Sequence, residues 1–142
     1  MPRKPRYLLC PPDHFRVDYA INPWMGGTVD PDVAERQWLE LEAAIQSAGA
    51  GVITIAPHPD LPDMVFTANA GAIKDKAVVL SNFRHAERQG ETDEFEAWFN
   101  SVGYHVHRLP RLMNFEGCGD VEFVHSDIMI GGFGFRSDLP AH

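Results

Sequence analysis

Hydrophobic residues along the chain fall into short continuous runs and helically spaced sets, with proline, glycine or polar residues between them. The first run, RYLLC at 6–10, precedes two prolines, which predicts a buried strand and then an extended loop. Comparable runs predict six more strands, at 52–56, 64–73, 77–81, 104–109, 121–124 and 127–132, with a turn at Ser126 joining the last two. Because helical segments separate these strands, the pattern indicates an α/β fold.

Two segments carry apolar residues at helical spacing. The first has Asp30 as its N-cap, Pro31 at its first helical position and glycines at 49–51 to end it. The second has Thr92 as its N-cap and Gly103 at its end. The positions expected to face the core are Ala34, Trp38, Leu41, Ile45 and Ala48 in the first helix and Phe95, Trp98, Phe99 and Val102 in the second.

The part of the chain that follows the first helix repeats itself at a period near 53 residues. Each copy reads helix, strand, loop with a carboxylate, hairpin, and loop with an arginine, which is the pattern of a repeated supersecondary unit. Ordinary alternation of helices and strands is the alternative interpretation. The matching positions, 52 or 53 residues apart, are Pro57 with Pro110, Asp63 with Glu116, Asp75 with Asp127, and Phe83-Arg84 with Phe135-Arg136.

The repeat predicts a ligand with two ends of opposite charge. Copies arranged about one axis would collect carboxylates and arginines around a shared centre. Carboxylates there would hold a guanidinium or an ammonium, and arginines would grip a carboxylate through paired hydrogen bonds. The loop at 11–27 mixes aromatic, amide and charged residues without any periodicity, which is typical of a loop that faces a ligand.

Composition restricts the partners. The 142 residues have the size and composition of one ordinary domain, and 12 Lys and Arg against 20 Asp and Glu give a net charge of −8, the wrong sign for a nucleic-acid surface. No run approaches a membrane span, and the basic cluster Arg3, Lys4 and Arg6 lacks the apolar segment of a signal peptide. Because no export signal is recognised, we expect a cytoplasmic protein, in whose reducing surroundings Cys10 and Cys118 would be free thiols.

Five segments in order carry a resemblance to a known family: INPWM, LPDMVFTANAG, HAERQGE, FEGCGD and GFGFRSD. They resemble the guanidino-group-modifying superfamily of arginine deiminase, dimethylarginine dimethylaminohydrolase and the amidinotransferases, with most likeness to arginine dihydrolase. The resemblance implies a pentein-like α/β propeller of five ββαβ units. This chain holds fewer than three, so residues 1–142 would be the N-terminal portion, roughly half, of such a catalytic domain.

The resemblance also implies the chemistry, which is hydrolysis of a guanidino group in arginine or an arginine derivative. A Cys thiolate attacks the guanidinium carbon, a His protonates the departing amine, and water hydrolyses the intermediate, without a cofactor. The family's Cys and His positions would fall beyond His142, so this chain alone is expected to be inactive. A non-catalytic module that binds arginine-like ligands, or an inert fragment, is the alternative. Self-association or a missing C-terminal half is the expected partner.

Carried over residue by residue, the resemblance assigns a role to seven positions. The acids Asp63 and Glu116 match guanidinium-binding residues, and Glu116 also matches the residue that orients the catalytic His. The arginines match a clamp on the substrate carboxylate, and the remaining positions line the pocket. The clamp residues are Arg88 and Arg136, and the pocket-lining residues are Asn69, Phe66 and Asn22.

Four residues have a plainer interpretation that we prefer. Asp120 fits a structural ion pair better than a ligand contact. Cys118 is a poor nucleophile because the neighbouring carboxylates of Glu116 and Asp120 would raise its pKa. His105 and His107 share one face of a predicted strand, but no third ligand has diagnostic spacing, so we expect surface histidines and no metal.

Overall fold

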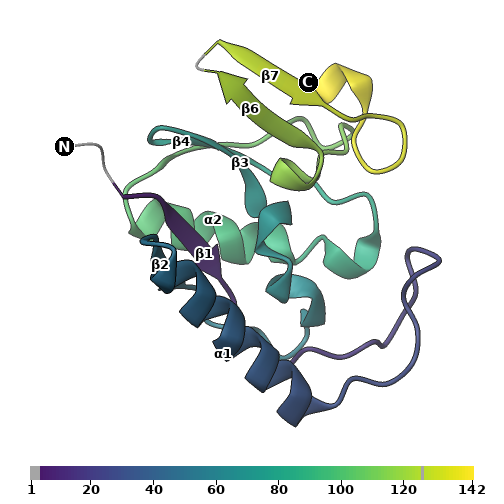
Figure 1. Cartoon of the computed structure of the whole chain (residues 1–142). Coiled ribbons are helices and arrows are strands. Elements are labelled where there is room, and N and C mark those ends of the chain that lie inside the picture. The colour runs from purple at the N-terminus through teal and green to yellow at the C-terminus, as the bar shows by residue number, and fades with distance from the viewer. Residues whose placement is uncertain (1–3, 126) are drawn as a thin grey trace. The chain divides into compact units, whose positions relative to one another are not determined.

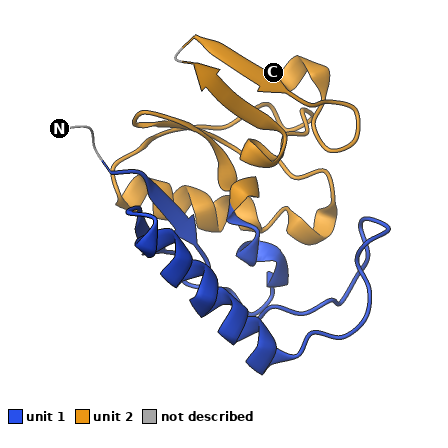
Figure 2. Ribbon diagram, viewed as in Figure 1, with its two compact units in different colours: residues 1–67 blue, residues 68–142 orange. Residues whose placement is uncertain are grey.

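The computed structural model describes residues 4–125 and 127–142, which include every predicted element except the turn at Ser126. The chain divides into two compact units, residues 1–67 and residues 68–142 (Figure 2). None of the helices in the described ranges is long and apolar enough to cross a membrane.

Unit 1 contains a parallel strand pair and one long helix. Strand β1 (Arg6–Leu9) pairs in parallel with β2 (Gly51–Thr54), and helix α1 (Pro31–Ser47) connects them and packs beside β2 (Figure 1). The predicted N-cap is confirmed, because the Asp30 carboxylate accepts hydrogen bonds from the backbone N–H groups of Asp32 and Val33.

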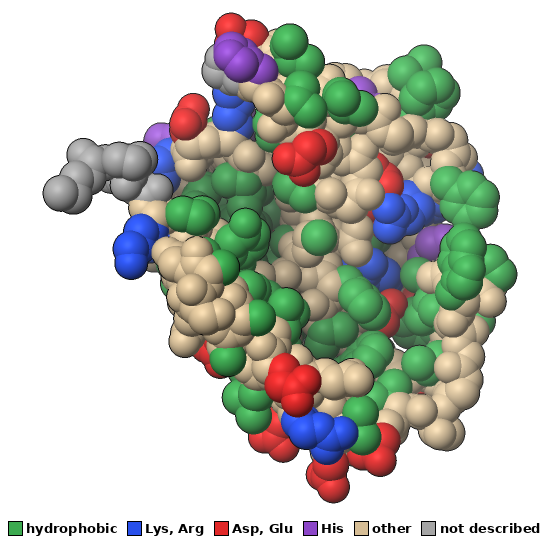
Figure 3. All heavy atoms as spheres, in the orientation of Figure 1, with side chains coloured by type: hydrophobic (Ala, Val, Ile, Leu, Met, Phe, Trp, Pro, Cys, Tyr) green, Lys and Arg blue, Asp and Glu red, His purple; other side chains and the backbone are tan. Residues whose placement is uncertain are grey.

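Helix α1 is less buried than its periodicity predicts. None of its residues is fully buried, Trp38 and Ile45 are half-buried, and Leu41 is half exposed. In unit 1 the helix packs beside β2, a strand of four residues, which leaves much of its apolar face uncovered. Trp38 therefore does not lie fully in the core, contrary to the prediction, but is only half-buried. Acidic side chains gather at one end of this helix in the space-filling view (Figure 3).

Unit 2 contains a three-stranded sheet, a helix and a separate hairpin. Strands β3 (Gly71–Lys74) and β4 (Ala77–Leu80) are antiparallel, and β5 (His105–His107) pairs in parallel with β4. Helix α2 (Glu91–Ser101) packs against β4 and β5. Strands β6 (Val121–His125) and β7 (Ile128–Gly131) form the hairpin (Figure 1).

The core of unit 2 lies between α2 and the sheet. Val78 and Leu80 of β4 and Phe95 and Phe99 of α2 are almost completely buried. Trp98 is half-buried and Val102 is exposed, so the helix buries a narrower stripe than predicted. Phe99 lies edge-on to the Tyr104 ring, which closes the corner between α2 and β5.

Two local predictions are wrong. The segment predicted as strand from residue 64 begins as two 3₁₀ turns, Pro62–Val65 and Thr67–Ala70, and only Gly71–Lys74 is extended. Pro62 fixes a helical φ at the first turn, and the Thr67 hydroxyl donates to the Leu8 carbonyl. Thr92 does not cap α2, because the helix begins at Glu91 and the Thr92 hydroxyl donates instead to the Ser81 carbonyl.

The two hairpins match the predicted repeat, but their equivalent side chains differ in how deeply they are buried. Val78 of the first copy is fully buried under α2, whereas Ile130, its counterpart 52 residues later, is 61% exposed. Phe83 is 1% exposed and its counterpart Phe135 is 79% exposed. Helix α2, which begins the second copy, covers the hairpin of the first, and within the described residues no helix covers the second hairpin in the same way.

This difference predicts unequal effects from equivalent mutations. Phe83→Ala removes a buried ring and should lower the free energy of unfolding by about 3–5 kcal/mol. Phe135→Ala removes an exposed ring and should change it by less than about 0.5 kcal/mol. Urea denaturation of both variants checks this, and similar losses in the two would contradict the burial difference.

Candidate functional site

Glu116 occupies the centre of a polar cluster in unit 2. It is the N-cap of a 3₁₀ turn, Gly117–Gly119, that packs beside β3. Its carboxylate is 2% exposed, and Oε2 lies 3.7 Å from Nε of Arg136. Among the described residues no group donates a hydrogen bond to Oε1. A buried carboxylate oxygen without a donor has unused capacity to accept a hydrogen bond from a ligand N–H.

The two glycines beside Glu116 are required by the packing. Gly117 has φ 59°, and a Cβ on it would lie 2.7 Å from the backbone nitrogen of Gly71. A Cβ on Gly119 would lie 2.2 Å from Nδ2 of Asn69 and 3.3 Å from Nη2 of Arg136. The close backbone approach expected from the sequence is therefore present at both glycines.

Asn69 and Arg88 are linked to Glu116 through hydrogen bonds. The Asn69 Nδ2 donates to the Glu116 carbonyl at 3.1 Å, and Arg88 Nη1 donates to the Asn69 Oδ1 at 3.2 Å. The Arg88 guanidinium is buried, lies 4.4 Å from the centre of the Phe83 ring and donates twice to Glu91, each bond 2.7 Å. The structure thus brings together three of the predicted site residues, Asn69, Arg88 and Glu116.

Arg136 is the second arginine near Glu116. Its Nη2 donates to the Gly119 carbonyl at 2.9 Å and to the Asp120 carboxylate. Asp120 also accepts from the Ser137 hydroxyl, whose oxygen accepts the Glu116 backbone N–H. The ion pair with Arg136 agrees with the structural interpretation of Asp120. The Arg136 side chain is 39% exposed, so part of its guanidinium still faces solvent.

Burial dominates the electrostatics of Glu116. Loss of hydration raises the pKa of its carboxyl group above the ordinary value. Arg88 and Arg136 lower the pKa but do not cancel this effect, and Asp120 raises it further. Arg88 is paired with Glu91, and Arg136 divides its guanidinium between a close contact with Asp120 and a longer one with Glu116, so neither arginine is held by Glu116 alone. The site therefore favours a cationic ligand that would restore the charged form.

The remaining predicted residues lie in unit 1. Asp63 is buried in the 3₁₀ turn Pro62–Val65. Phe66 ends that turn, is about half exposed and stands edge-on to Phe15 with ring centres 5.7 Å apart. Asn22 forms a turn in which its Oδ1 accepts the backbone N–H groups of Trp24 and Met25.

Neither cysteine has the surroundings of an activated thiol. Cys10 is buried, and Cys118 is exposed with a pKa raised above its ordinary value. Desolvation by the surrounding protein is the main cause, and the Glu122 carboxylate adds to it. The direction is as predicted, although the acids expected to cause it were Glu116 and Asp120.

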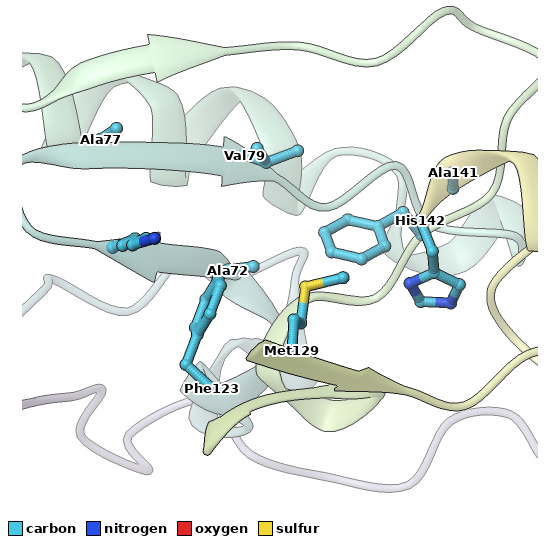
Figure 4. Close-up of a pocket in the computed structure, with 9 residues that line it drawn as sticks. Ala72, Ala77, Val79, Phe123, Met129, Ala141 and His142 are labelled. Atoms are coloured by element: carbon cyan, nitrogen blue, oxygen red, sulfur yellow. The ribbon is translucent and has the colours of Figure 1, made fainter. Parts of the chain in front are cut away.

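A cavity of about 260 Å³ lies elsewhere in unit 2, between the β3–β4 strands and the β6–β7 hairpin (Figure 4). Its wall is mostly apolar, with Val79, Phe123 and Met129 pointing inward. Lys74 brings a positive charge, which would repel a guanidinium. Within residues 4–125 and 127–142, no three His, Cys, Asp or Glu side chains are placed to hold a metal ion, and His105 and His107 are exposed.

Sequence reasoning missed two members of the cluster, Glu91 and Ser137. Glu91 stands three residues after Arg88, so the helical i, i+3 spacing could have indicated an ion pair. Ser137 follows Arg136 in an irregular loop, where no periodic pattern shows the direction of its hydroxyl.

The burial of Glu116 predicts that Glu116→Gln stabilises the fold at neutral pH. A carboxyl with a raised folded-state pKa contributes stability below its unfolded pKa, and this is lost as the pH rises through the folded pKa. We expect Glu116→Gln to melt at a higher temperature than the wild type at pH 7, with the difference shrinking below about pH 4. The matched control is Glu122→Gln on the exposed β6, which should leave the melting temperature unchanged. A lower melting temperature for Glu116→Gln at pH 7 would contradict this reading.

No family model matches the chain. Among curated proteins, it is 48% identical over 141 residues to the bifunctional arginine dihydrolase/ornithine cyclodeaminase ArgZ of Synechocystis. It is 44% identical over 143 residues to an N(G),N(G)-dimethylarginine dimethylaminohydrolase of Mycobacterium tuberculosis. These matches cover 96% and 99% of the chain, but only 20% of ArgZ and 46% of the mycobacterial protein.

Solved structures show the same relationship. The N-terminal domain of ArgZ, as a cysteine-to-serine mutant bound to its substrate, matches with a TM-score of 0.92 and 47% identity, covering 96% of this chain and 52% of that one. Another structure of that domain holds a covalently bound reaction intermediate. A dimethylarginine dimethylaminohydrolase adduct matches with a TM-score of 0.79 at 21% identity, which supports the fold alone.

The chain spans about half the length of the solved domains it matches, and nearly all of its own length takes part. These matches confirm the predicted fold class, a partial α/β propeller with repeated ββαβ units. Similarity at 44–48% identity extends over both copies of the repeat and every segment that carried the sequence resemblance. Its homologues over nearly the whole of its own length are therefore arginine dihydrolase and dimethylarginine dimethylaminohydrolase, two enzymes that modify guanidino groups.

Proposed function

We propose that residues 1–142 are the N-terminal portion of a catalytic domain that hydrolyses the guanidino group of arginine or an arginine derivative. In this proposal the chain supplies the ligand-binding side of the site. The observation that carries it is Glu116, a buried carboxylate whose Oε1 accepts no hydrogen bond from any described residue.

A guanidinium suits the Glu116 carboxylate for two reasons. Its planar N–H groups can donate to a carboxylate in pairs, which would satisfy Oε1. Its positive charge would also offset the desolvation that raises the pKa of Glu116. The solvent-facing part of Arg136 would then bind the carboxylate of the same amino acid.

Five further residues complete the proposed site. Asp63 would be the second carboxylate on the guanidinium, and Phe66 would contact the apolar stem of the ligand. Arg88 would add positive charge near the ligand carboxylate. Asn69 and Asn22 would line the pocket with amide groups.

The nucleophile and the catalytic histidine are proposed to come from polypeptide outside these 142 residues. Cys10 is buried and Cys118 has a raised pKa, so neither cysteine is poised as a thiolate. With those groups supplied, Glu116 would orient the histidine. The reaction would convert arginine to ornithine, ammonia and carbon dioxide, or deiminate it to citrulline.

A second candidate is binding without turnover. The same observations favour it, since a ligand-binding carboxylate is present and an activated cysteine is not. The 142-residue chain would then retain or sense arginine-like ligands. We propose a cytoplasmic location for either function, because both cysteines are free thiols.

The β6–β7 hairpin is the proposed surface for self-association. Its exposed apolar side chains include Val124, Ile128 and Ile130, and hydrophobic side chains are visible over this region in Figure 3. In the first copy of the repeat the equivalent surface is covered by α2. In the isolated chain we propose that a second copy covers it.

Calorimetric titration with L-arginine tests the binding function. We expect saturable binding by the wild-type chain, and at least about a tenfold loss of affinity in Glu116→Gln and in Asp63→Asn because each removes a charged acceptor. Cys118→Ala is the control and should bind as the wild type does.

Two outcomes, one of the titration and one of an ammonia assay, would contradict these proposals. Absence of binding by the folded wild-type chain would contradict both candidate functions. Ammonia release by the chain alone, abolished in Cys118→Ala, would contradict the proposal that the nucleophile lies elsewhere.

Sedimentation velocity tests the hairpin surface. We expect the wild-type chain to self-associate as its concentration rises. Ile130→Asp should weaken this association by at least about tenfold, because it places a charge on the face that association would bury. The matched control is Leu112→Asp, which alters a 93% exposed leucine outside the hairpin and should change nothing. A wild-type chain that stays monomeric at high concentration would refute the self-association.

A further inference from the structure

Glu91 is a buried carboxylate that the proposed function does not use. It is the first residue of α2 and is completely buried. Its two oxygens accept hydrogen bonds from Nε and Nη2 of Arg88, each 2.7 Å long. This two-point contact fixes the plane of the Arg88 guanidinium, which a single hydrogen bond would leave free to turn.

The fixed guanidinium in turn orients Asn69. Arg88 Nη1 donates to the Asn69 Oδ1, so the amide must present its nitrogen on the opposite side. That nitrogen donates to the backbone carbonyl of Glu116. The series of contacts therefore runs from Glu91 through Arg88 and Asn69 to the residue that carries the proposed ligand site.

The packing around Asn69 and Arg88 leaves little space for another arrangement. The Phe83 ring lies against the Arg88 guanidinium, 4.4 Å from ring centre to its carbon. On the other side, the Asn69 nitrogen is so close to Gly119 that a Cβ there would be 2.2 Å away. A change in the direction of Arg88 would therefore be transmitted to Asn69.

Charge gives Glu91 a second effect. Arg88 is close enough to Glu116 to lower the pKa of that carboxyl group, so it is a potential competitor for it. Pairing with Glu91 offsets the Arg88 charge and holds its Nε and Nη2 N–H groups toward α2. The Glu116 carboxylate is then left for a cationic ligand.

We propose that Glu91 is a positioning residue of the guanidinium site: by holding Arg88 in a two-point contact, it orients the Asn69 amide and keeps Arg88 away from the Glu116 carboxylate. This inference rests on the proposed function, which it deepens. A purely structural ion pair would stabilise α2 but would leave the Asn69 amide and ligand affinity unchanged once the variant had folded.

The test is ¹⁵N NMR of the full 142-residue chain combined with arginine titration. In Glu91→Gln, the Arg88 Nε–H signal and both Asn69 side-chain N–H signals should shift, and arginine affinity should fall by about tenfold because the amide and Arg88 are released. The matched control is Glu94→Gln, which makes the same charge change at an exposed position in the same turn of α2. It should leave all three signals and the affinity unchanged.

A second variant keeps the test usable if Glu91→Gln does not fold, since breaking a buried ion pair is strongly destabilising. Glu91→Asp retains the charge but shortens the side chain, so it should shift the same signals and weaken arginine binding by a smaller factor. Unchanged Asn69 signals in a folded Glu91 variant would overturn the inference, and so would shifted signals with unchanged affinity. Absence of arginine binding by the wild type would overturn the proposed function alone, because the signals still report whether Glu91 orients Asn69.

Discussion

The burial of the Glu116 carboxylate is the constraint on which the rest of unit 2 depends. Removing a carboxylate from water is costly unless charges and hydrogen bonds replace the lost hydration. Here two arginines lie near it, but Arg88 is paired with Glu91, and Arg136 contacts Asp120 more closely than it contacts Glu116. The chain thus keeps an acid in an unfavourable state, which is common where a protein binds a charged ligand.

The surrounding backbone is built to maintain this arrangement. Gly117 and Gly119 allow the turn at Glu116 to approach β3 and Asn69 more closely than any side chain would permit. Ser137 links the Glu116 backbone to Asp120, and Asp120 fixes Arg136. Small and polar residues in an irregular loop therefore position the site, while the apolar contacts of α2 with the sheet supply the stability.

Much of the fold was predictable from periodicity, and the exceptions have local causes. The Asp30 cap, the two helices and the two hairpins follow from hydrophobic spacing and turn residues. The strand predicted from residue 64 failed because Pro62 and the Thr67 side chain impose turns that hydrophobicity does not reveal. Burial was also misjudged on the helices, since Trp38 is only half-buried and Val102 is exposed. The repeat likewise does not reveal burial, since Phe83 and Phe135 occupy equivalent positions but only the first is buried.

The site was predictable as far as the repeat and the family motifs reached. They led to Glu116, Asn69, Arg88 and Arg136, which hydrogen bonds and ion pairs connect in unit 2. Ser137 could not be assigned a role, because its importance depends on side-chain direction within an irregular loop, whereas the i, i+3 spacing of Arg88 and Glu91 did carry a signal. Sequence spacing indicates which residues recur, but only the folded structure shows which acid forms an ion pair with each arginine.

The central claim is that Glu116 is a buried carboxylate reserved for a guanidinium, and its titration tests this most directly. Carboxyl ¹³C NMR of the chain, recorded with and without saturating L-arginine, follows the Glu116 pKa through its full range. We expect a pKa above the ordinary glutamate value in the free chain and a clear decrease when arginine binds, because the ligand cation stabilises the charged form. An ordinary pKa in the free chain, or one that saturating arginine leaves unchanged, would contradict the claim.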